Sequence, residues 1–192
     1  MYRTPSAPPP EDCIRAVLAG IAERDRLREA LTKYIGDVAW MGPTITVHEE
    51  IREQEERDVQ RVSGVLGSVA GLFTQRTARI EDETRELEDA TARVATLTAK
   101  RESGRIAVAE LQRQILGLAE ADASLEAAVR ERATPILQTA TWTGRRLRVI
   151  DSALVGIDVE LEQAVATGAK LDLIERRDEL ALERAHLLER TL

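Results

Sequence analysis

An apolar residue recurs at every seventh position through the middle of the chain, and this repeat limits the possible folds more than any other feature. From Val59 to Ile136, ten of the twelve residues at this spacing are apolar, the exceptions being Arg101 and Asp122. In the series three positions further on, Val62 to Arg132, seven of eleven are apolar. A repeat kept in one phase over this length is typical of a very long helix with a coiled-coil seam.

Composition agrees with an elongated helical protein. Only five of the 192 residues are aromatic and 32% are charged, whereas a compact globule usually depends on more aromatic area. The net charge of −7 disfavours a general nucleic-acid binder, whose affinity comes from neutralising phosphates. No apolar run is long enough for a transmembrane helix.

The N-terminal residues 1–9 are rich in proline, lack the apolar centre of a secretory signal, and are expected to form a flexible tail. Cys13 is the single cysteine, so no intrachain disulfide is expected. Its position on an apolar helix face predicts a small buried residue.

Capping and breaking signals divide the rest of the chain into helices. Gly42-Pro43 predicts a break, Thr46 with Glu49 has the spacing of a capping box, and Thr134-Pro135 predicts a new helix start. Ser103-Gly104 is a weak point that we interpret as part of an unbroken helix, because the seam keeps its phase there. The expected helices are 10–41, 46–132, 135–167 and 169–191.

The lengths of these helices suggest how the seam is covered. The 87 residues of 46–132 match the first helix and the C-terminal segment taken together, so both could fold back along the central helix. The expected fold is therefore all-α: an extended antiparallel coiled-coil or helical-hairpin rod, built on one very long central helix as a single elongated domain, 10–192. In this arrangement Asp122 should pair with Arg145 or Arg146, and Arg101 should lie near residues 166–170.

The segment Val62–Gln75 carries no charged residue and contains several glycines. An all-round apolar helix is buried on more than one side, and the folded-back arrangement brings two chain ends to this segment. Burial in the core is the favoured interpretation. A dimer contact and a lipid contact are the alternatives.

Catalytic chemistry has little support. Glu183-x-x-His186 has the spacing of half a di-iron carboxylate site, but His48 has no glutamate three residues before it. No nucleophile elbow or phosphate-binding loop is present. We expect no enzyme activity, no metal and no cofactor.

Charge is unevenly placed along the chain. Residues 48–58 are acidic, and five arginines lie within 130–148. Both clusters are consistent with solvated helix ends. The alternative is that the basic cluster docks an acidic protein, an anionic lipid surface or the acidic cluster of another copy of the chain. The candidate partner-binding residues are Arg130, Arg132, Arg145, Arg146 and Arg148.

Each tryptophan is the first residue of a Trp-x-Gly pattern, at Trp40-Met41-Gly42 and Trp142-Thr143-Gly144. The first, between two expected helices, is similar to the hairpin turn of the Trp-x-Gly family of type VII secretion substrates. This resemblance covers about residues 10–75 and implies a secreted helical hairpin protein or a chaperone. The sequence lacks the family's Tyr-x-x-x-Asp/Glu tail after the hairpin.

Taken together, these features predict a non-enzymatic structural or protein-interaction coiled-coil protein in the cytoplasm, a subunit or spacer of a larger, self-associating assembly. Its expected partners are proteins, including further copies of itself. A peripheral membrane-remodelling helical protein is the second hypothesis, and the secreted hairpin protein or chaperone is the third.

Overall fold

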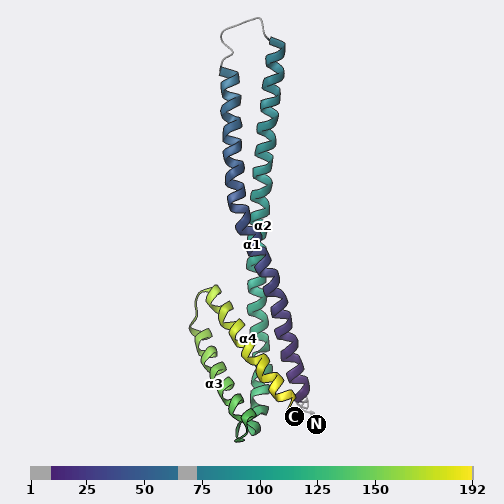
Figure 1. The fold of residues 1–192 in the computed structure, drawn as a ribbon, viewed down its shortest axis with the longest axis vertical. Coiled ribbons are helices and arrows are strands. Elements are labelled where there is room, and N and C mark those ends of the chain that lie inside the picture. The colour runs from purple at the N-terminus through teal and green to yellow at the C-terminus, as the bar shows by residue number, and fades with distance from the viewer. Residues whose placement is uncertain (1–9, 65–72, 192) are drawn as a thin grey trace, which may run out of the picture. The chain divides into compact units, whose positions relative to one another are not determined.

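The structure is a computed structural model that describes residues 10–64 and 73–191, and all regular structure in these ranges is α-helical (Figure 1). The expected all-α fold is confirmed. The helices are α1 (Pro10–Gly64), α2 (Phe73–Leu137), α3 (Trp142–Gln163) and α4 (Thr167–Glu189).

Helix α1 runs straight through the expected break at Gly42-Pro43, so that boundary is wrong. Proline lacks an N–H and leaves the carbonyl of Ala39 without its helical donor. Ala39 is exposed, so water can bind this carbonyl. On the other side of the helix Ile45 is only 6% exposed. Its packing stabilises the helix that Gly42-Pro43 disfavours.

A single helix from 46 to 132 is also wrong, because α1 ends at Gly64 and α2 begins at Phe73. The uncharged segment Val62–Gln75 falls mainly on residues 65–72, which lie outside the described residues. By contrast, the helix continues through Ser103-Gly104 as expected. Gly104 is buried, and a Cβ at this position would lie 2.6 Å from Cγ2 of Val38. Close packing therefore explains this glycine.

The C-terminal boundaries differ by a few residues from the expected ones. Helix α2 continues through Pro135 to Leu137, and α3 starts where the Thr141 side chain caps the helix by accepting a hydrogen bond from the N–H of Gly144 at 3.1 Å. The boundary expected between 135–167 and 169–191 lies a few residues earlier, since α3 stops at Gln163 and α4 begins at Thr167.

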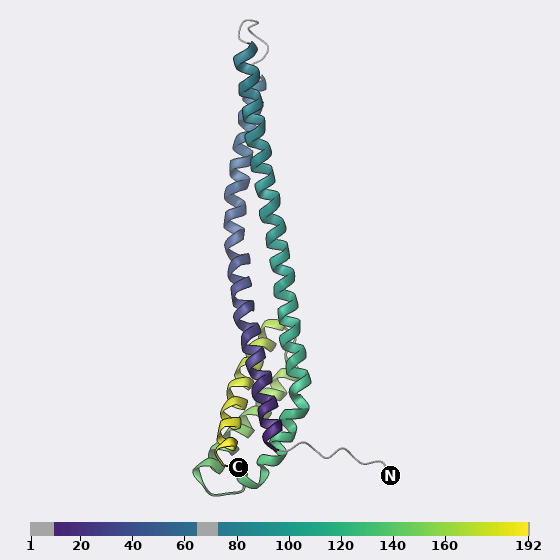
Figure 2. The same cartoon turned by 90° about the vertical axis from the view of Figure 1, so that its right-hand side faces the viewer.

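The chain divides into two compact units. The first comprises Met1–Leu31 and Glu110–Leu192. Within it α3 and α4 lie side by side and antiparallel (Figures 1 and 2). Apolar residues from all four helices form its core, and Cys13 is buried there as expected. The core residues are Cys13, Ile14, Val17, Ile21, Val129, Ala133, Leu147, Ala181, Ala185 and Leu188.

The second unit comprises Thr32–Ala109. In both views its two helical segments, 32–64 of α1 and 73–109 of α2, run antiparallel beside each other (Figures 1 and 2). Val38 and Ile45 of α1 face inward, together with Ala90 and Gly104 of α2. This seam also includes the half-buried polar residues His48, Arg52, Glu55 and Arg101.

Candidate functional site

Two of the five arginines proposed as a docking cluster form ion pairs inside the first unit. Nε of Arg130 donates to Oδ1 of Asp151 at 2.9 Å, which joins α2 to α3. Arg146 on α3 makes a bidentate pair with Glu183 on α4, with distances of 2.6 and 2.7 Å. A bidentate pair fixes the side chains of Arg146 and Glu183 in one geometry, and Arg130 also reaches Asp158 at 3.4 Å, so both arginines have partners within the first unit.

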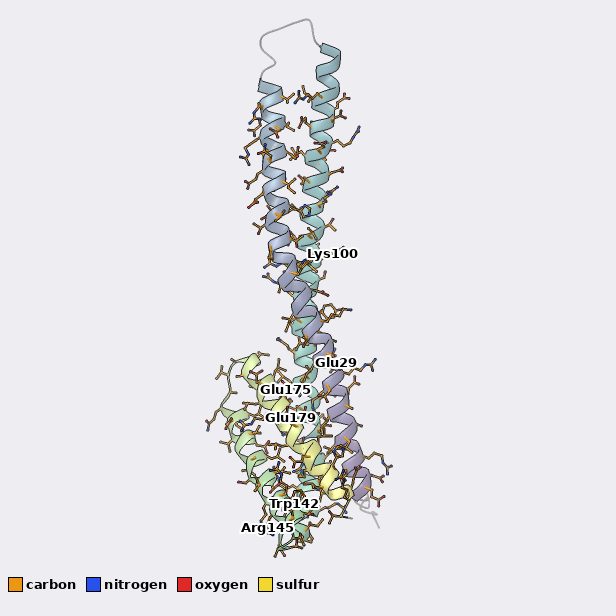
Figure 3. The ribbon with its side chains drawn as sticks, in the orientation of Figure 1. Glu29, Lys100, Trp142, Arg145, Glu175 and Glu179 are labelled. Carbon is orange, nitrogen blue, oxygen red and sulfur yellow. The ribbon has the colours of Figure 1, made fainter. Side chains whose placement is uncertain are left out.

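The other three arginines differ from one another. Arg148 donates to the backbone carbonyls of Leu137 and Thr139, the latter at 3.2 Å, and so secures the α2–α3 connection. Arg132 also interacts within the chain. Arg145 is exposed at the start of α3, where Figure 3 labels it beside Trp142, and its side chain has no hydrogen bond or ion pair within the described residues. The five arginines therefore do not form one shared site.

The sequence did not predict the buried ion pairs at the centre of the first unit. Arg24 of α1 is 0% exposed and makes a bidentate pair with Asp178 of α4, Nε to Oδ2 at 2.9 Å and Nη2 to Oδ1 at 2.7 Å. It also donates to Asp122 of α2. Burial alone would lower the pKa of Arg24, but its hydrogen bonds to the two aspartates outweigh that effect and raise it. The expected pairing of Asp122 with Arg145 or Arg146 is therefore wrong.

Further along the same helices, Glu126 of α2 lies between two arginines of α4. Its Oε2 is 3.1 Å from Nη2 of Arg177 and 3.8 Å from Nη2 of Arg184, whereas Oε1 is buried with no hydrogen-bond donor in the structure. Burial raises the pKa of Glu126, and the two arginines oppose this shift. Burial also lowers the pKa of Arg184, whose nitrogens make no hydrogen bond.

The ion pairs between the helices of the first unit join equal numbers of positive and negative side chains. Five arginines face five carboxylates across α1, α2, α3 and α4, and none is left as a surplus charge that would attract a ligand ion. We call this set the buried charge network: Arg24, Arg28, Arg130, Arg177, Arg184, Asp122, Glu126, Asp151, Asp158 and Asp178.

A sequence signal for this network does exist. Asp151 and Asp158 are seven residues apart on α3, and Arg177 and Arg184 are seven apart on α4. Residues seven apart lie on one helix face, so two acids and two arginines at this spacing on neighbouring helices could have indicated an inward-facing set. Such charges usually remain in solvent, and for that reason they were not expected in the interior.

A groove of about 550 Å³ lies between α2, α3 and α4. Apolar side chains line it together with network residues that pair with each other, such as Glu126 with Arg177 and Arg130 with Asp158. Three further charged residues, Glu120, Glu162 and Lys170, also line it. The side chains that line it offer no hydroxyl, thiol or imidazole.

Potential metal ligands lie at two places in the described residues. Glu183 is held by Arg146, whose hydrogen bond lowers the pKa of this carboxyl, and His186 is exposed. In the second unit Glu55, Glu83 and Glu86 have carboxylate oxygens within 4.8 Å of one another. Partial desolvation and the neighbouring carboxylates raise the pKa of Glu55. Like charges at this distance disfavour one another's ionised form.

Apolar side chains are exposed along one face of α1 in the second unit. Trp40 is 66% exposed, Val47 53% and Ile51 42%. The spacing of four, three, four and four residues places the set on one side of the helix, and every member is exposed. We call it the outer α1 face: Gly36, Trp40, Pro43, Val47 and Ile51.

A second exposed face lies on α3 in the first unit. Val149 is 59% exposed, Val155 46% and Val159 47%, while the opposite side of the helix buries Leu147 and Leu154. We call this surface the outer α3 face: Arg145, Val149, Ser152, Val155, Gly156 and Val159.

The Trp-x-Gly pattern at Trp40 does not form the hairpin turn that the resemblance implied. Trp40 and Gly42 lie inside α1, more than twenty residues before it ends at Gly64, and Trp142 is the first residue of α3. Trp40 and Trp142 are each 66% exposed.

No family model, curated protein or solved structure matches this chain. Among the helices of the described ranges, none is both long and apolar enough to cross a membrane.

Proposed function

We propose that this chain is a non-enzymatic structural protein that binds other proteins through helix faces, as a subunit or spacer of a larger assembly. The observation that carries the proposal is the outer α1 face. Its residues repeat at coiled-coil spacing, yet they point to solvent, while the inward face of the same segment includes His48, Arg52 and Glu55. An exposed, contiguous apolar face of this kind is typical of a protein-binding surface.

The distribution of charge supports the same proposal. The charged side chains of the buried charge network pair with each other, and four of them, Glu126, Arg130, Asp158 and Arg177, line the groove. A helix that offers tryptophan and branched aliphatic residues at this spacing fits an apolar helix face on a partner protein. The proposed location is the cytoplasm, whose reducing conditions suit the free Cys13 thiol.

The test is affinity purification of the tagged full chain from its host, followed by quantitative mass spectrometry. We compare the wild-type chain with the double variant Trp40→Glu, Val47→Glu, which places charge on the outer α1 face. The matched control is Ile106→Glu, which changes an apolar residue of the same unit that is 64% exposed on α2. We expect the same proteins to be enriched with the wild-type chain and the control, and to be lost with the double variant.

Enrichment that is equal for all three chains, or no enrichment with any of them, would contradict this proposal. Circular dichroism of the purified variants establishes that each retains the helical content of the wild-type chain.

A further inference from the structure

The outer α3 face differs from the rest of the first unit in how its charges are placed. Helix α3 has no acidic residue in its first turn and no basic residue in its last turn. Arg145 and Arg148 are exposed near its start, and Glu160 and Glu162 are exposed near its end. A helix macrodipole favours the opposite arrangement, with acids at the N-terminus and bases at the C-terminus. An antiparallel neighbouring helix that also has basic residues near its start and acidic residues near its end would place acids beside the start of α3 and bases beside its end.

The chain already contains one such neighbour. Helix α4 lies antiparallel to the inner side of α3 and places Glu183 beside Arg146 in a bidentate pair. On the outer side, the side chains of Arg145 and Glu160 have no hydrogen bond or ion pair within the described ranges. The outer side of α3 therefore offers the charged side chains of Arg145 and Glu160 to a helix of another molecule.

Two pairs of residues on the outer side of α3 are placed symmetrically about one point of the helix. Arg145 and Glu160 are equally far along the helix from the midpoint between Ser152 and Ala153, and so are Val149 and Gly156. A two-fold axis at this midpoint would place Arg145 against Glu160 of the second molecule and Val149 against its Gly156. An isologous interface requires this kind of symmetry, in which one patch fits a second copy of itself.

The central residues allow a second helix to approach closely. Ser152, Ala153 and Gly156 are small, and a Cβ added at Gly156 would meet no other atom within 4 Å. The valines on either side would then pack over these small residues. The 22 residues of α3 give a contact about 33 Å long at 1.5 Å per residue.

From these observations we propose that the outer α3 face is a homodimer interface, in which the α3 helices of two copies pack antiparallel around Ser152. The inference rests on the proposed function, because it names one partner of the scaffold: a second copy of the chain. One helix per copy gives a small interface compared with about 1,200 Å² for stable complexes. The dimer is therefore weak and depends on concentration.

The test is sedimentation velocity of the purified full chain from low to high micromolar concentration. The wild-type chain should shift from the 21.3 kDa monomer toward twice that mass as concentration rises. Arg145→Glu should weaken the dissociation constant at least tenfold, and Arg145→Glu combined with Glu160→Arg should restore most of the affinity. Val149→Glu should abolish the dimer. Val165→Glu, at an apolar residue that is 95% exposed outside the helix, should leave it unchanged.

A second measurement does not depend on affinity. Ser152→Cys should form a covalent dimer on mild oxidation, because the two-fold axis brings both copies of this residue together. Val165→Cys should not, and the native Cys13 is buried.

A wild-type chain that stays monomeric at every concentration would overturn the inference, as would a charge swap that restores no affinity. These outcomes concern α3 and the purified chain alone. The affinity purification described above tests other proteins at the outer α1 face, so failure of one proposal is distinguishable from failure of the other.

Discussion

The guanidinium of Arg24 and the carboxylate of Asp178 join the first and last helices of the chain through two hydrogen bonds, at 2.9 and 2.7 Å. They are 154 residues apart in sequence, and both are buried. Arg28 adds a second donor to the same carboxylate. A buried pair contributes little net stability over an apolar replacement, but removal of one partner leaves an uncompensated charge in the interior.

Arg24→Met should therefore destabilise the first unit strongly, by about 3–5 kcal/mol. The substitution keeps an unbranched side chain but leaves Asp122 and Asp178 without their shared donor. Urea unfolding followed by Trp142 fluorescence, in a Trp40→Phe background, reports on this unit. The control is Arg26→Met, whose wild-type side chain is 81% exposed and should change stability by less than about 0.5 kcal/mol. If both substitutions change the free energy of unfolding by equally small amounts, the Arg24–Asp178 pair does not stabilise the first unit.

Glu126→Gln should stabilise the protein at neutral pH. Burial raises the pKa of Glu126 in the folded state above its ordinary value of 4.5. At a pH between 4.5 and this raised pKa, the folded state holds a proton that the unfolded state has released. The free energy of unfolding therefore falls as pH rises through this window. Glutamine imitates the protonated acid, so the variant should unfold at higher urea concentration than the wild-type chain at pH 7, and the two should converge below about pH 4.

Glu183→Gln provides the opposite case for comparison. The hydrogen bond from Arg146 lowers the pKa of Glu183, so its contribution is present above the unfolded pKa and is lost as pH falls through the folded pKa. This variant should be less stable than the wild-type chain at pH 7 and equal to it in acid. If Glu126→Gln also proves less stable at pH 7, attraction to Arg177 and Arg184 outweighs the cost of burial.

Gly20→Ala should destabilise the chain although alanine is the better helix former. A Cβ at Gly20 would overlap the carboxylate of Asp122, with Cγ only 2.9 Å away, and would push it from its place beside Arg24. Gly117→Ala on α2 is the matched control, because a Cβ there meets nothing within 4 Å. It should raise stability by about 0.5–1 kcal/mol. Thermal unfolding of both variants measures the difference, and a rise in melting temperature for Gly20→Ala would contradict the close packing.

Pro43→Ala should stabilise the second unit by about 1–3 kcal/mol, because it restores the backbone donor to Ala39 and removes the ring that opposes the helix. Urea unfolding followed by Trp40 fluorescence, in a Trp142→Phe background, detects the change. A loss of stability would mean that the proline imposes a bend that the second unit requires.

Much of the helical content was predictable from the sequence, and so was part of the core. Ile115 and Val129 of the seven-residue repeat are buried, and so is Cys13. Helix boundaries were less predictable. Pro43 and Pro135 are strong local signals, yet both lie inside helices because tertiary packing outweighs local preference.

The prediction of a single helix over 46–132 was wrong for another physical reason. A seven-residue repeat records which positions face the seam, but it does not record the direction of the chain. Val59 and Ile80 share one phase of the repeat although they lie on different, antiparallel helices. The buried charge network was missed because each of its members, taken alone, has the composition of a solvent-exposed helix residue.

Site-specific photo-cross-linking in the host tests most directly whether exposed helix faces, rather than a catalytic pocket, carry the function of this protein. A photoreactive phenylalanine analogue replaces Trp40 on the outer α1 face or, as a control, the exposed Lys100 of the same unit (Figure 3). We predict that the probe at position 40 forms defined protein adducts that Val47→Glu abolishes, while the probe at position 100 forms none. Adducts that are equal at both positions, or absent at position 40, would contradict the claim.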